Sequence, residues 1–240
     1  MKNLKSINEF WGAVIRRDMS SAVREEDKFH NKEELREYLK EEIRKQGKSV
    51  VIKNLDVSGI ENLAYLFSGL LNDVGTLDLS GWNTSGVKSM SGMFSHTTPE
   101  VINLSGWNTS SVIDMSWMFG NCEKLKSLDL TGWDTSSVEN VHYIFYCCEN
   151  LQSLDVSGWD TGKVTDMRYV FYGCEKLKSL DLTGWDTVGV VNMSHMFCDC
   201  ESLSSLDLSG WSTDSVKNMR YMFDNCPAPY KIIDDKIVKI

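Results

Sequence analysis

A chain of 240 residues is long enough to bury a sizeable core in one or two domains, and its 42% hydrophobic content argues against a disordered protein. No apolar run approaches the roughly 20 residues that a membrane-spanning helix needs, which favours a cytoplasmic protein, or an extracellular one if a secretion signal was removed. The net charge of −9 is uneven: residues 1–48 hold 12 Lys+Arg against 10 Asp+Glu, and the remainder holds 13 against 24. Such an acidic surface repels phosphate backbones, so we expect a protein partner, in particular one with a basic surface, and neither nucleic acid nor membrane.

Residues 1–48 are predicted to form an N-terminal helical cap. A first helix is expected over residues 7–23. A second helix begins after Asn31, a typical N-cap residue, and ends at Gly47, a typical C-terminal residue. The apolar residues of this second helix share one face; they are Leu35, Tyr38, Leu39 and Ile43.

The centre of the chain is an internal repeat. A tryptophan and a phenylalanine each recur at intervals of 25 or 26 residues. The tryptophans are Trp82, Trp107, Trp133, Trp159, Trp185 and Trp211, and the phenylalanines are Phe94, Phe119, Phe145, Phe171, Phe197 and Phe223. The stretch LDVSGIENLAYLF at 55–67 matches WDTSSVENVHYIF at 133–145, so it is predicted to be a degenerate first rung. Residues 49–226 are therefore predicted to form a solenoid of about seven rungs.

Each rung combines a strand signal with a helix signal. In LKSLDLTGW at 177–185, Leu180 and Leu182 alternate with polar residues, which is the period of a strand. In SVENVHYIFYCC at 137–148, the apolar residues share one face of a short α- or 3₁₀-helix; they are Val138, Val141, Ile144, Phe145 and Cys148. The predicted fold class is therefore an α/β repeat, a leucine-rich-repeat-like solenoid with parallel strands on one face and short helices on the other.

The rung pattern L-x-x-L-D-L-S-G-W-D-T-S-x-V-x-x-M-x-x-M-F resembles the 26-residue repeat of BspA-like bacterial leucine-rich-repeat proteins over residues 55–226. The resemblance implies a right-handed solenoid. Members of this family are often lipoproteins or wall-anchored proteins of the cell surface that bind other proteins or host components. The resemblance therefore implies a binding role of this kind. No catalytic residues come with the resemblance.

Residues 227–240 are predicted to cap the other end, because a terminal rung would otherwise expose its core and strand edge. Pro227 and Pro229 end the last rung, and YKIIDDKIVKI is predicted to be an edge strand, or a hairpin that turns at Asp234 and Asp235. We expect the two caps and the solenoid to form one continuous domain.

Five of the seven cysteines form a ladder, three residues after each rung phenylalanine; they are Cys122, Cys148, Cys174, Cys200 and Cys226. The period places them in the core, so we expect buried, reduced thiols, with Cys147 and Cys198 outside the ladder reacting first. His195, Cys198 and Cys200 are of metal-ligand types, but Cys200 should point inward and Cys198 away. We therefore expect no metal site and no cofactor.

An acidic column follows the strands, where leucines on both sides direct it outward; it consists of Asp78, Asn103, Asp129, Asp155, Asp181 and Asp207. Neighbouring serines such as Ser153 are expected to hydrogen-bond to these carboxylates. The column is interpreted as a solvated strand face. Two alternatives stay open, a cation site and an acidic face for a basic partner.

A further column lies two residues before each rung phenylalanine and holds Tyr65, Gly92, Trp117, Tyr143, Tyr169, His195 and Tyr221. On a helix this position faces away from the apolar side, so these rings should be exposed. Tyr146 and Tyr172 would widen the column, and Arg168 and Arg220 lie beside it. Tyr, Trp and Arg are enriched at binding hot spots, although stacking between rungs would explain the rings structurally. We take this stripe as the candidate partner-binding surface.

No nucleophile, base and orienting group recur together in the sequence, so an enzyme is not expected. The predicted function is a protein–protein interaction module that binds through the aromatic stripe, the acidic face or both. One alternative is an acidic inhibitor or nucleic-acid-mimicking decoy, of a phage or mobile-element anti-defence type, that blocks the basic groove of a target enzyme. Another is a fragment of a surface adhesin.

Overall fold

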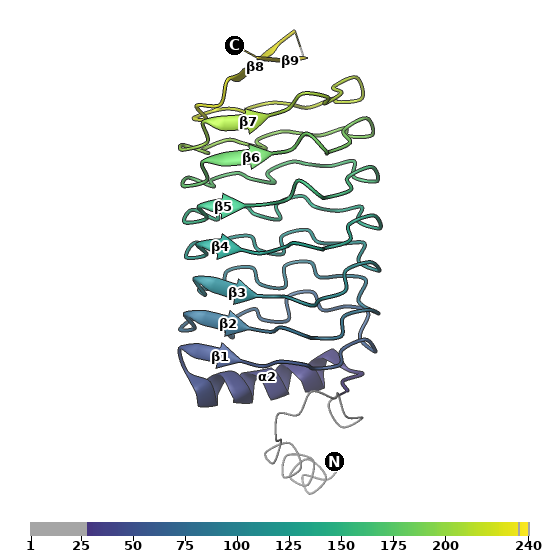
Figure 1. Cartoon of the computed structure of the whole chain (residues 1–240), viewed down its shortest axis with the longest axis vertical. Helices are drawn as coiled ribbons and strands as arrows, with labels where there is room; N and C mark the ends of the chain where they lie inside the picture. Colours follow the sequence, from purple (N-terminus) through teal and green to yellow (C-terminus); the bar gives the residue numbers. More distant parts are fainter. Residues whose placement is uncertain (1–27, 235, 240) are drawn as a thin grey trace, which may run out of the picture.

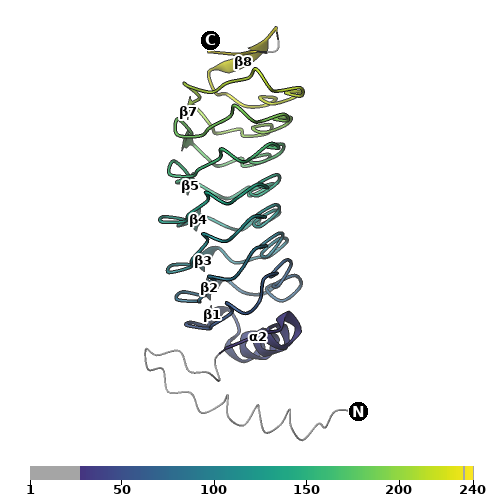
Figure 2. The ribbon, with the colours of Figure 1, turned by 90° about the vertical axis from the view of Figure 1, so that its right-hand side faces the viewer.

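The computed structural model describes residues 28–234 and 236–239, so the helix expected over residues 7–23 lies outside the described residues. The described chain is a rod of stacked rungs, with a helix at one end and a hairpin at the other (Figure 1). Figure 2, turned by 90°, shows the short strands along one side of the rod and loops along the opposite side. Within the described residues, the structure contains no helix with the length and apolar character that crossing a bilayer requires.

The strands are short, parallel and stacked in chain order. They are β1 (Ser49–Val51), β2 (Thr76–Asp78), β3 (Val101–Asn103), β4 (Ser127–Leu128), β5 (Ser153–Leu154), β6 (Ser179–Asp181) and β7 (Ser205–Asp207). β1 to β5 form one sheet, and β6 and β7 form a separate pair. The register aligns one buried apolar residue per strand, for example Val50 with Leu77 and Leu180 with Leu206. The predicted parallel-strand solenoid is confirmed.

Helix α2 (Lys32–Gln46) covers the first rung, as the sequence pattern predicts. The Asn31 side chain accepts a hydrogen bond from the Glu33 N–H at 2.8 Å, and Gly47 ends the helix with a left-handed φ of 69°. The predicted apolar face is buried; it consists of Leu35, Tyr38, Leu39 and Ile43.

The polar face of α2 bonds to backbone carbonyls of the first rung. The Arg36 guanidinium donates to the carbonyl oxygens of Leu66 and, at 2.6 Å, of Ser68. The Lys32 ammonium donates to the Ala64 carbonyl at 3.3 Å. These carbonyls have no preceding rung to bond, so the helix supplies the missing donors.

The short helices predicted for the side opposite the strands do not form. We expected short helices there, but these segments are consecutive turns, and α2 is the only helix among the described residues. The residues two before and two after each rung phenylalanine have a left-handed backbone, for example Tyr143 with φ 60° and Cys147 with φ 51°. Each left-handed residue interrupts the right-handed path that an α-helix needs.

Alternate N–H groups of this segment point to the next rung instead of along a helix axis. In the rung of Phe171, four N–H groups donate to carbonyls of the following rung at 2.8–3.1 Å; the donors are Met167, Tyr169, Phe171 and Gly173. The N–H groups between them, such as those of Tyr172 and Cys174, donate back three residues within the rung. We call this stack of turns the turn ladder.

Aromatic columns fill the space between strands and turns. Consecutive rung phenylalanines from Phe67 to Phe223 stack with ring centroids 5.1–5.8 Å apart. Beside them, Trp82 stacks on Trp107, and Trp185 stacks on both Trp159 and Trp211. The Trp107 indole N–H donates to the Leu79 carbonyl at 2.9 Å. The indole N–H groups of Trp82, Trp185 and Trp211 also donate to backbone carbonyls, which is typical of structural rings in a core.

Each rung bends at corners where an Asp or Asn side chain accepts a hydrogen bond from the N–H two residues later. In one rung Asp155, Asp160 and Asp166 accept from Ser157, Gly162 and Arg168 at 2.9–3.0 Å. The recurring Asp and Asn residues therefore shape the rung.

The last rung is followed by an antiparallel hairpin of β8 (Tyr230–Ile233) and β9 (Lys236–Lys239). The Tyr230 ring stacks on Phe223 at 6.2 Å, and its hydroxyl accepts a hydrogen bond from the Leu208 N–H at 3.2 Å. The hairpin thereby covers the strand side of the last rung.

Candidate interaction surface

The aromatic residues predicted to bind a partner lie together as one stack. Ring centroids are 4.3 Å apart for Trp117 and Tyr143, 4.6 Å for Tyr143 and Tyr169, and 4.5 Å for Tyr169 and His195, with interplanar angles of at most 11°. Tyr221 follows His195 at 4.9 Å. The turn ladder produces this stack, because it places the same position of successive rungs directly above one another.

A second, shorter column widens the stack. Tyr146 and Tyr172 stack on each other at 5.0 Å, and the Tyr146 ring also lies 5.3 Å from Trp117 and 5.4 Å from Tyr143. We call the two columns together the aromatic stripe, which consists of Trp117, Tyr143, Tyr146, Tyr169, Tyr172, His195 and Tyr221.

The exposure of the stripe differs from the expectation in its middle. Tyr143 and Tyr169 are half-buried, because each ring covers the faces of its neighbours, whereas Tyr221 at the end is 56% exposed. A partner at the middle of the stripe would therefore contact ring edges and hydroxyl groups. At the other end the stack stops at Gly92, where the ring of Tyr65 occupies the space that a side chain would need.

The left-handed backbone at the stripe position is unusual for aromatic residues. Trp117, Tyr143, Tyr169, His195 and Tyr221 all have φ between 56° and 60°. This conformation costs a residue with a side chain roughly 1–2 kcal/mol relative to the right-handed one. Stacking between neighbouring rings offsets part of that cost, because an aromatic pair contributes about 0.5–1.5 kcal/mol.

Arg168 and Arg220, the two arginines predicted beside the stripe, have different surroundings. The Arg168 guanidinium carbon lies 5.9 Å from the centroid of Tyr143, and its Nε is 3.2 Å from the Asp166 carboxylate. This side chain therefore bridges the stripe and a corner of the rung. Arg220 is exposed beside Tyr221.

Three hydroxyls of the stripe, those of Tyr143, Tyr146 and Tyr172, have a raised pKa and stay protonated at neutral pH. Burial raises the pKa of Tyr146 to about 12 and also raises the pKa of Tyr143. The Tyr172 hydroxyl donates to the Asp199 carboxylate, which raises the pKa of Tyr172, and the Asn225 amide donates to the same carboxylate at 2.7 Å. The stripe thus presents hydrogen-bond donors next to apolar ring edges.

The acidic column stands on the strand side of the rod, but its hydrogen bonds are not the predicted ones. We expected the neighbouring Ser153 to bond Asp155, whereas Asp155 accepts from the N–H and the hydroxyl of Ser157 at 3.0 and 2.7 Å. The hydrogen bonds from Ser157 hold the pKa of Asp155 below its usual value. Related bonds lower the pKa of Asp129 and Asp207.

Asp78 and Asn103 depart from the rest of the column. Asp78 pairs with the Lys53 ammonium at 2.8 Å and accepts from the Asn103 amide at 3.1 Å. The exposed carboxylates of the column are therefore concentrated in the later rungs, at Asp129, Asp155, Asp181 and Asp207.

The cysteine ladder lies in the core as free thiols. The Sγ atoms of Cys122, Cys148, Cys174 and Cys200 donate to phenylalanine carbonyls of the preceding rung at 3.0–3.2 Å. Burial raises the pKa of these thiols.

The other three cysteines, Cys147, Cys198 and Cys226, differ in burial. Cys198, which we expected to point away from the core, is buried, and Cys226 at the end of the ladder is half-buried like Cys147. Among the described residues, no three His, Cys, Asp or Glu side chains come together in a group that could hold a metal ion.

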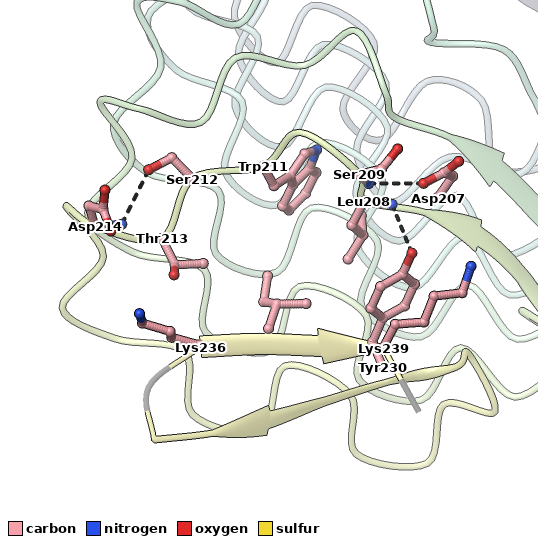
Figure 3. A pocket seen from close by; sticks show the side chains of 11 residues that line it. Asp207, Leu208, Ser209, Trp211, Ser212, Thr213, Asp214, Tyr230, Lys236 and Lys239 are labelled. Carbon is pink, nitrogen blue, oxygen red and sulfur yellow. Dashed lines mark hydrogen bonds between the residues drawn. The ribbon is translucent and has the colours of Figure 1, made fainter.

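The sequence predicted the cap at the C-terminal end of the rod but not the two pockets beside it. A pocket of about 570 Å³ lies between the last rung and β9, bordered by Trp211, Asp207 and Lys236 (Figure 3). Figure 3 shows Tyr230 on one side of this pocket, with its hydroxyl directed at Leu208. A second pocket of about 770 Å³ lies on the turn side, between the last rung and β8. Neither pocket has a sequence signal of its own, because both arise where the repeat stops.

Comparison with known proteins gives one result on the family. No curated protein and no solved structure matches the chain. A family model, described as Mycoplasma protein of unknown function, DUF285, matches residues 17–154 and 147–235, which is compatible with a BspA-like repeat protein. These two matches include most of the chain and all of the solenoid, so the protein belongs to the DUF285 family.

Proposed function

We propose that this protein is a non-enzymatic interaction module that binds a partner protein through the aromatic stripe, with Arg168 and Arg220 at its border. The repeat solenoid suits an interaction module in general, since stacked rungs provide an extended, regular surface. The observation that carries the more specific proposal is the uninterrupted stack from Trp117 to Tyr221 on the outside of the rod.

The backbone conformation supports a role beyond packing. Gly92 shows that the fold accepts glycine at the stripe position, where φ is 58° and glycine is free of the steric cost. The later rungs nevertheless carry large aromatic residues at the same backbone conformation. A side chain placed at a conformational cost on a surface is a reason to look for a functional role.

The chemistry of the nucleophilic groups supports a non-enzymatic role. The four buried ladder thiols donate to backbone carbonyls, and their raised pKa disfavours the reactive thiolate. The exposed carboxylates of the later rungs, such as Asp129 and Asp155, repeat in one environment, which does not separate a general acid from a general base. The repeated motif and the family match support a BspA-like assignment within this proposal.

The test replaces the middle of the stripe while keeping the backbone. Asparagine tolerates a left-handed φ, so the variant is Trp117→Asn, Tyr143→Asn and Tyr169→Asn together. The wild-type protein is used to capture and identify a partner, whose affinity for both proteins is then measured by calorimetry. We expect the triple variant to lose at least about tenfold in affinity, as for hot-spot residues.

Tyr65→Asn is the matched control. Tyr65 has the same left-handed backbone and is 52% exposed, but Gly92 separates it from the stack. It should leave partner affinity unchanged. An unchanged affinity of a triple variant that still unfolds cooperatively would refute the role of the stripe.

The acidic face supports a second candidate, an inhibitor or decoy that occupies a basic groove. The observation that favours this candidate is a row of carboxylates whose pKa is lowered by hydrogen bonds, including Asp129, Asp155 and Asp207. Asn103 already replaces the carboxylate at one position and keeps the corner hydrogen bond at 3.1 Å, so Asp→Asn changes should preserve the fold. This candidate predicts a partner affinity that falls steeply with salt and with Asp155→Asn plus Asp181→Asn. An affinity that is insensitive to both would exclude it.

A further inference from the structure

The two ends of the turn ladder are closed differently. At the N-terminal end, Lys32 and Arg36 of α2 bond the free carbonyls of Ala64, Leu66 and Ser68. At the C-terminal end it is the N–H groups that lack a following rung. In the last rung these belong to Met219, Tyr221, Phe223 and Asn225, and none has an acceptor among the described residues.

The preceding rung shows what these N–H groups are built to bind. The equivalent N–H groups of Met193, His195, Phe197 and Asp199 all donate to carbonyls of the last rung, at 2.8–3.0 Å. The acceptors are spaced two residues apart, as they are in every such rung of the ladder. A row of unpaired, evenly spaced backbone donors is a template for another chain segment.

The hairpin covers the strand side of the last rung and leaves the turn side open. The Tyr230 ring stacks on Phe223 at the end of the phenylalanine column. Its hydroxyl accepts from the N–H of Leu208, the residue after β7 (Figure 3). Next to the unpaired N–H groups lies the pocket of about 770 Å³, whose wall includes Met219, Tyr221 and Phe223. Three of the four donor residues therefore line the pocket, and Asn225 follows Asp224 of the same wall.

The charge and shape of this pocket restrict its occupant. Its wall carries three cations, Lys217, Arg220 and Lys231, against one carboxylate, Asp224. Tyr221 ends the aromatic stack and is 56% exposed, so an incoming aromatic ring can stack on it as Tyr221 itself stacks on His195.

We propose that this pocket binds one acidic, turn-forming peptide segment of a partner protein, which adds to the turn ladder as a further rung. The peptide carbonyls would accept from the four N–H groups, an aromatic side chain would stack on Tyr221, and carboxylates would face the three cations. This inference goes beyond the proposed function, because the middle of the aromatic stripe takes no part in it.

A second copy of the chain is a poorer occupant. Head-to-tail stacking would require free carbonyls on the first rung of that copy, but its α2 already bonds them through Lys32 and Arg36. A peptide segment of another protein has no such obstruction.

The first measurement uses the free protein. Amide hydrogen exchange followed by NMR should be at least about tenfold faster at Met219, Tyr221, Phe223 and Asn225 than at the equivalent amides of the preceding rung. Equal protection in the two rungs would mean that the last rung already has acceptors, and the proposal would be wrong.

The second measurement adds a synthetic peptide that copies residues 113–122 with Cys122→Ser. This probe carries Asp114, Trp117 and Phe119 at the positions of a rung. We expect saturable shift changes at the four amides and at least about tenfold slower exchange when the peptide is bound. A peptide of scrambled order should cause neither, and an absence of shifts up to millimolar peptide would overturn the proposal.

Charge reversal separates this site from the stripe. Lys217→Glu with Lys231→Glu should weaken the peptide at least about tenfold, whereas the control Lys163→Glu, at an exposed lysine of an earlier rung, should not. The Trp117, Tyr143 and Tyr169 variant should keep peptide binding, so the two proposals can fail separately. Concentration-dependent self-association that protects the four amides would assign the pocket to a second copy and overturn the partner peptide.

Discussion

The hydroxyl of Tyr230 accepts a hydrogen bond from the N–H of Leu208 at 3.2 Å. At the equivalent position of an earlier rung, the N–H donates to a backbone carbonyl of the next rung. In that earlier case, the Leu79 N–H donates to the Asn103 carbonyl at 2.9 Å. The Tyr230 ring also continues the phenylalanine column beyond Phe223. The Tyr230 side chain therefore supplies both an acceptor for the Leu208 N–H and the last ring of the phenylalanine column.

Tyr230→Phe should remove the acceptor and keep the ring. We expect the free energy of unfolding to fall by about 1 kcal/mol, the usual effect of losing one hydrogen bond. Tyr230→Ala should cost about 3 kcal/mol, because the end of the core loses a buried ring. Urea unfolding measures both, and equal losses for the two variants would contradict the role given to the hydroxyl.

Arg36→Ala should destabilise the N-terminal end of the rod. It removes charged donors from carbonyls of the first rung, and we expect a loss of about 1.5–3 kcal/mol in the free energy of unfolding. Arg44→Ala is the control on the same helix, since Arg44 pairs with Glu41 at an exposed site and its loss should leave the free energy of unfolding nearly unchanged. If the two variants have the same stability, the carbonyl contacts of Arg36 contribute nothing.

Gly92→Ala tests the break in the aromatic column. Gly92 has a φ of 58°, and a Cβ there meets the ring of Tyr65. We expect a loss of at least about 1 kcal/mol, from the left-handed backbone and the displaced ring. Gly158→Ala should cost less, since a Cβ at Gly158 meets no atom within 4 Å and its φ is not left-handed. Thermal unfolding of both variants measures these losses. If Gly92→Ala leaves the stability unchanged, the ring of Tyr65 moves aside without cost.

The buried thiols predict a loss of stability at high pH. Burial raises the pKa of Cys122 from 9.0 to about 11, partly opposed by hydrogen bonding with Thr97. Below about pH 9 the thiol is protonated in both the folded and the unfolded chain. Above that pH the unfolded chain releases the proton first, which stabilises the unfolded state. The free energy of unfolding therefore falls until the pH passes about 11. The slope is up to about 1.4 kcal/mol per pH unit for one thiol.

Cys122→Ala isolates this effect. Unfolding by urea between pH 8 and pH 11 should show a smaller decline for the variant than for the wild type, because all other titrating groups are common to both. Parallel curves would mean that the Cys122 thiol titrates alike in the folded and unfolded chains.

Local pattern was enough to predict much of the fold. The spacing of Trp and Phe determined the period, the alternation around Leu180 determined the strand, and the face of Leu35 and Ile43 determined helix α2. These inferences succeed because burial of an apolar side chain depends first on its position within one rung or one helix turn. The candidate stripe was found in the same way, since a column of the repeat becomes a column of the structure.

Tertiary structure decided the features that depend on the next rung. The spacing of Val138, Val141 and Ile144 suits a helix and a chain of turns equally, and turns form because the N–H groups of Tyr143 and Phe145 find carbonyls in the neighbouring rung. Stacking likewise half-buries the rings that the sequence placed outside. The open row of donors at the last rung follows from the same cause: each rung satisfies the hydrogen bonds of its neighbour, so the end of the repeat leaves them unpaired among the described residues.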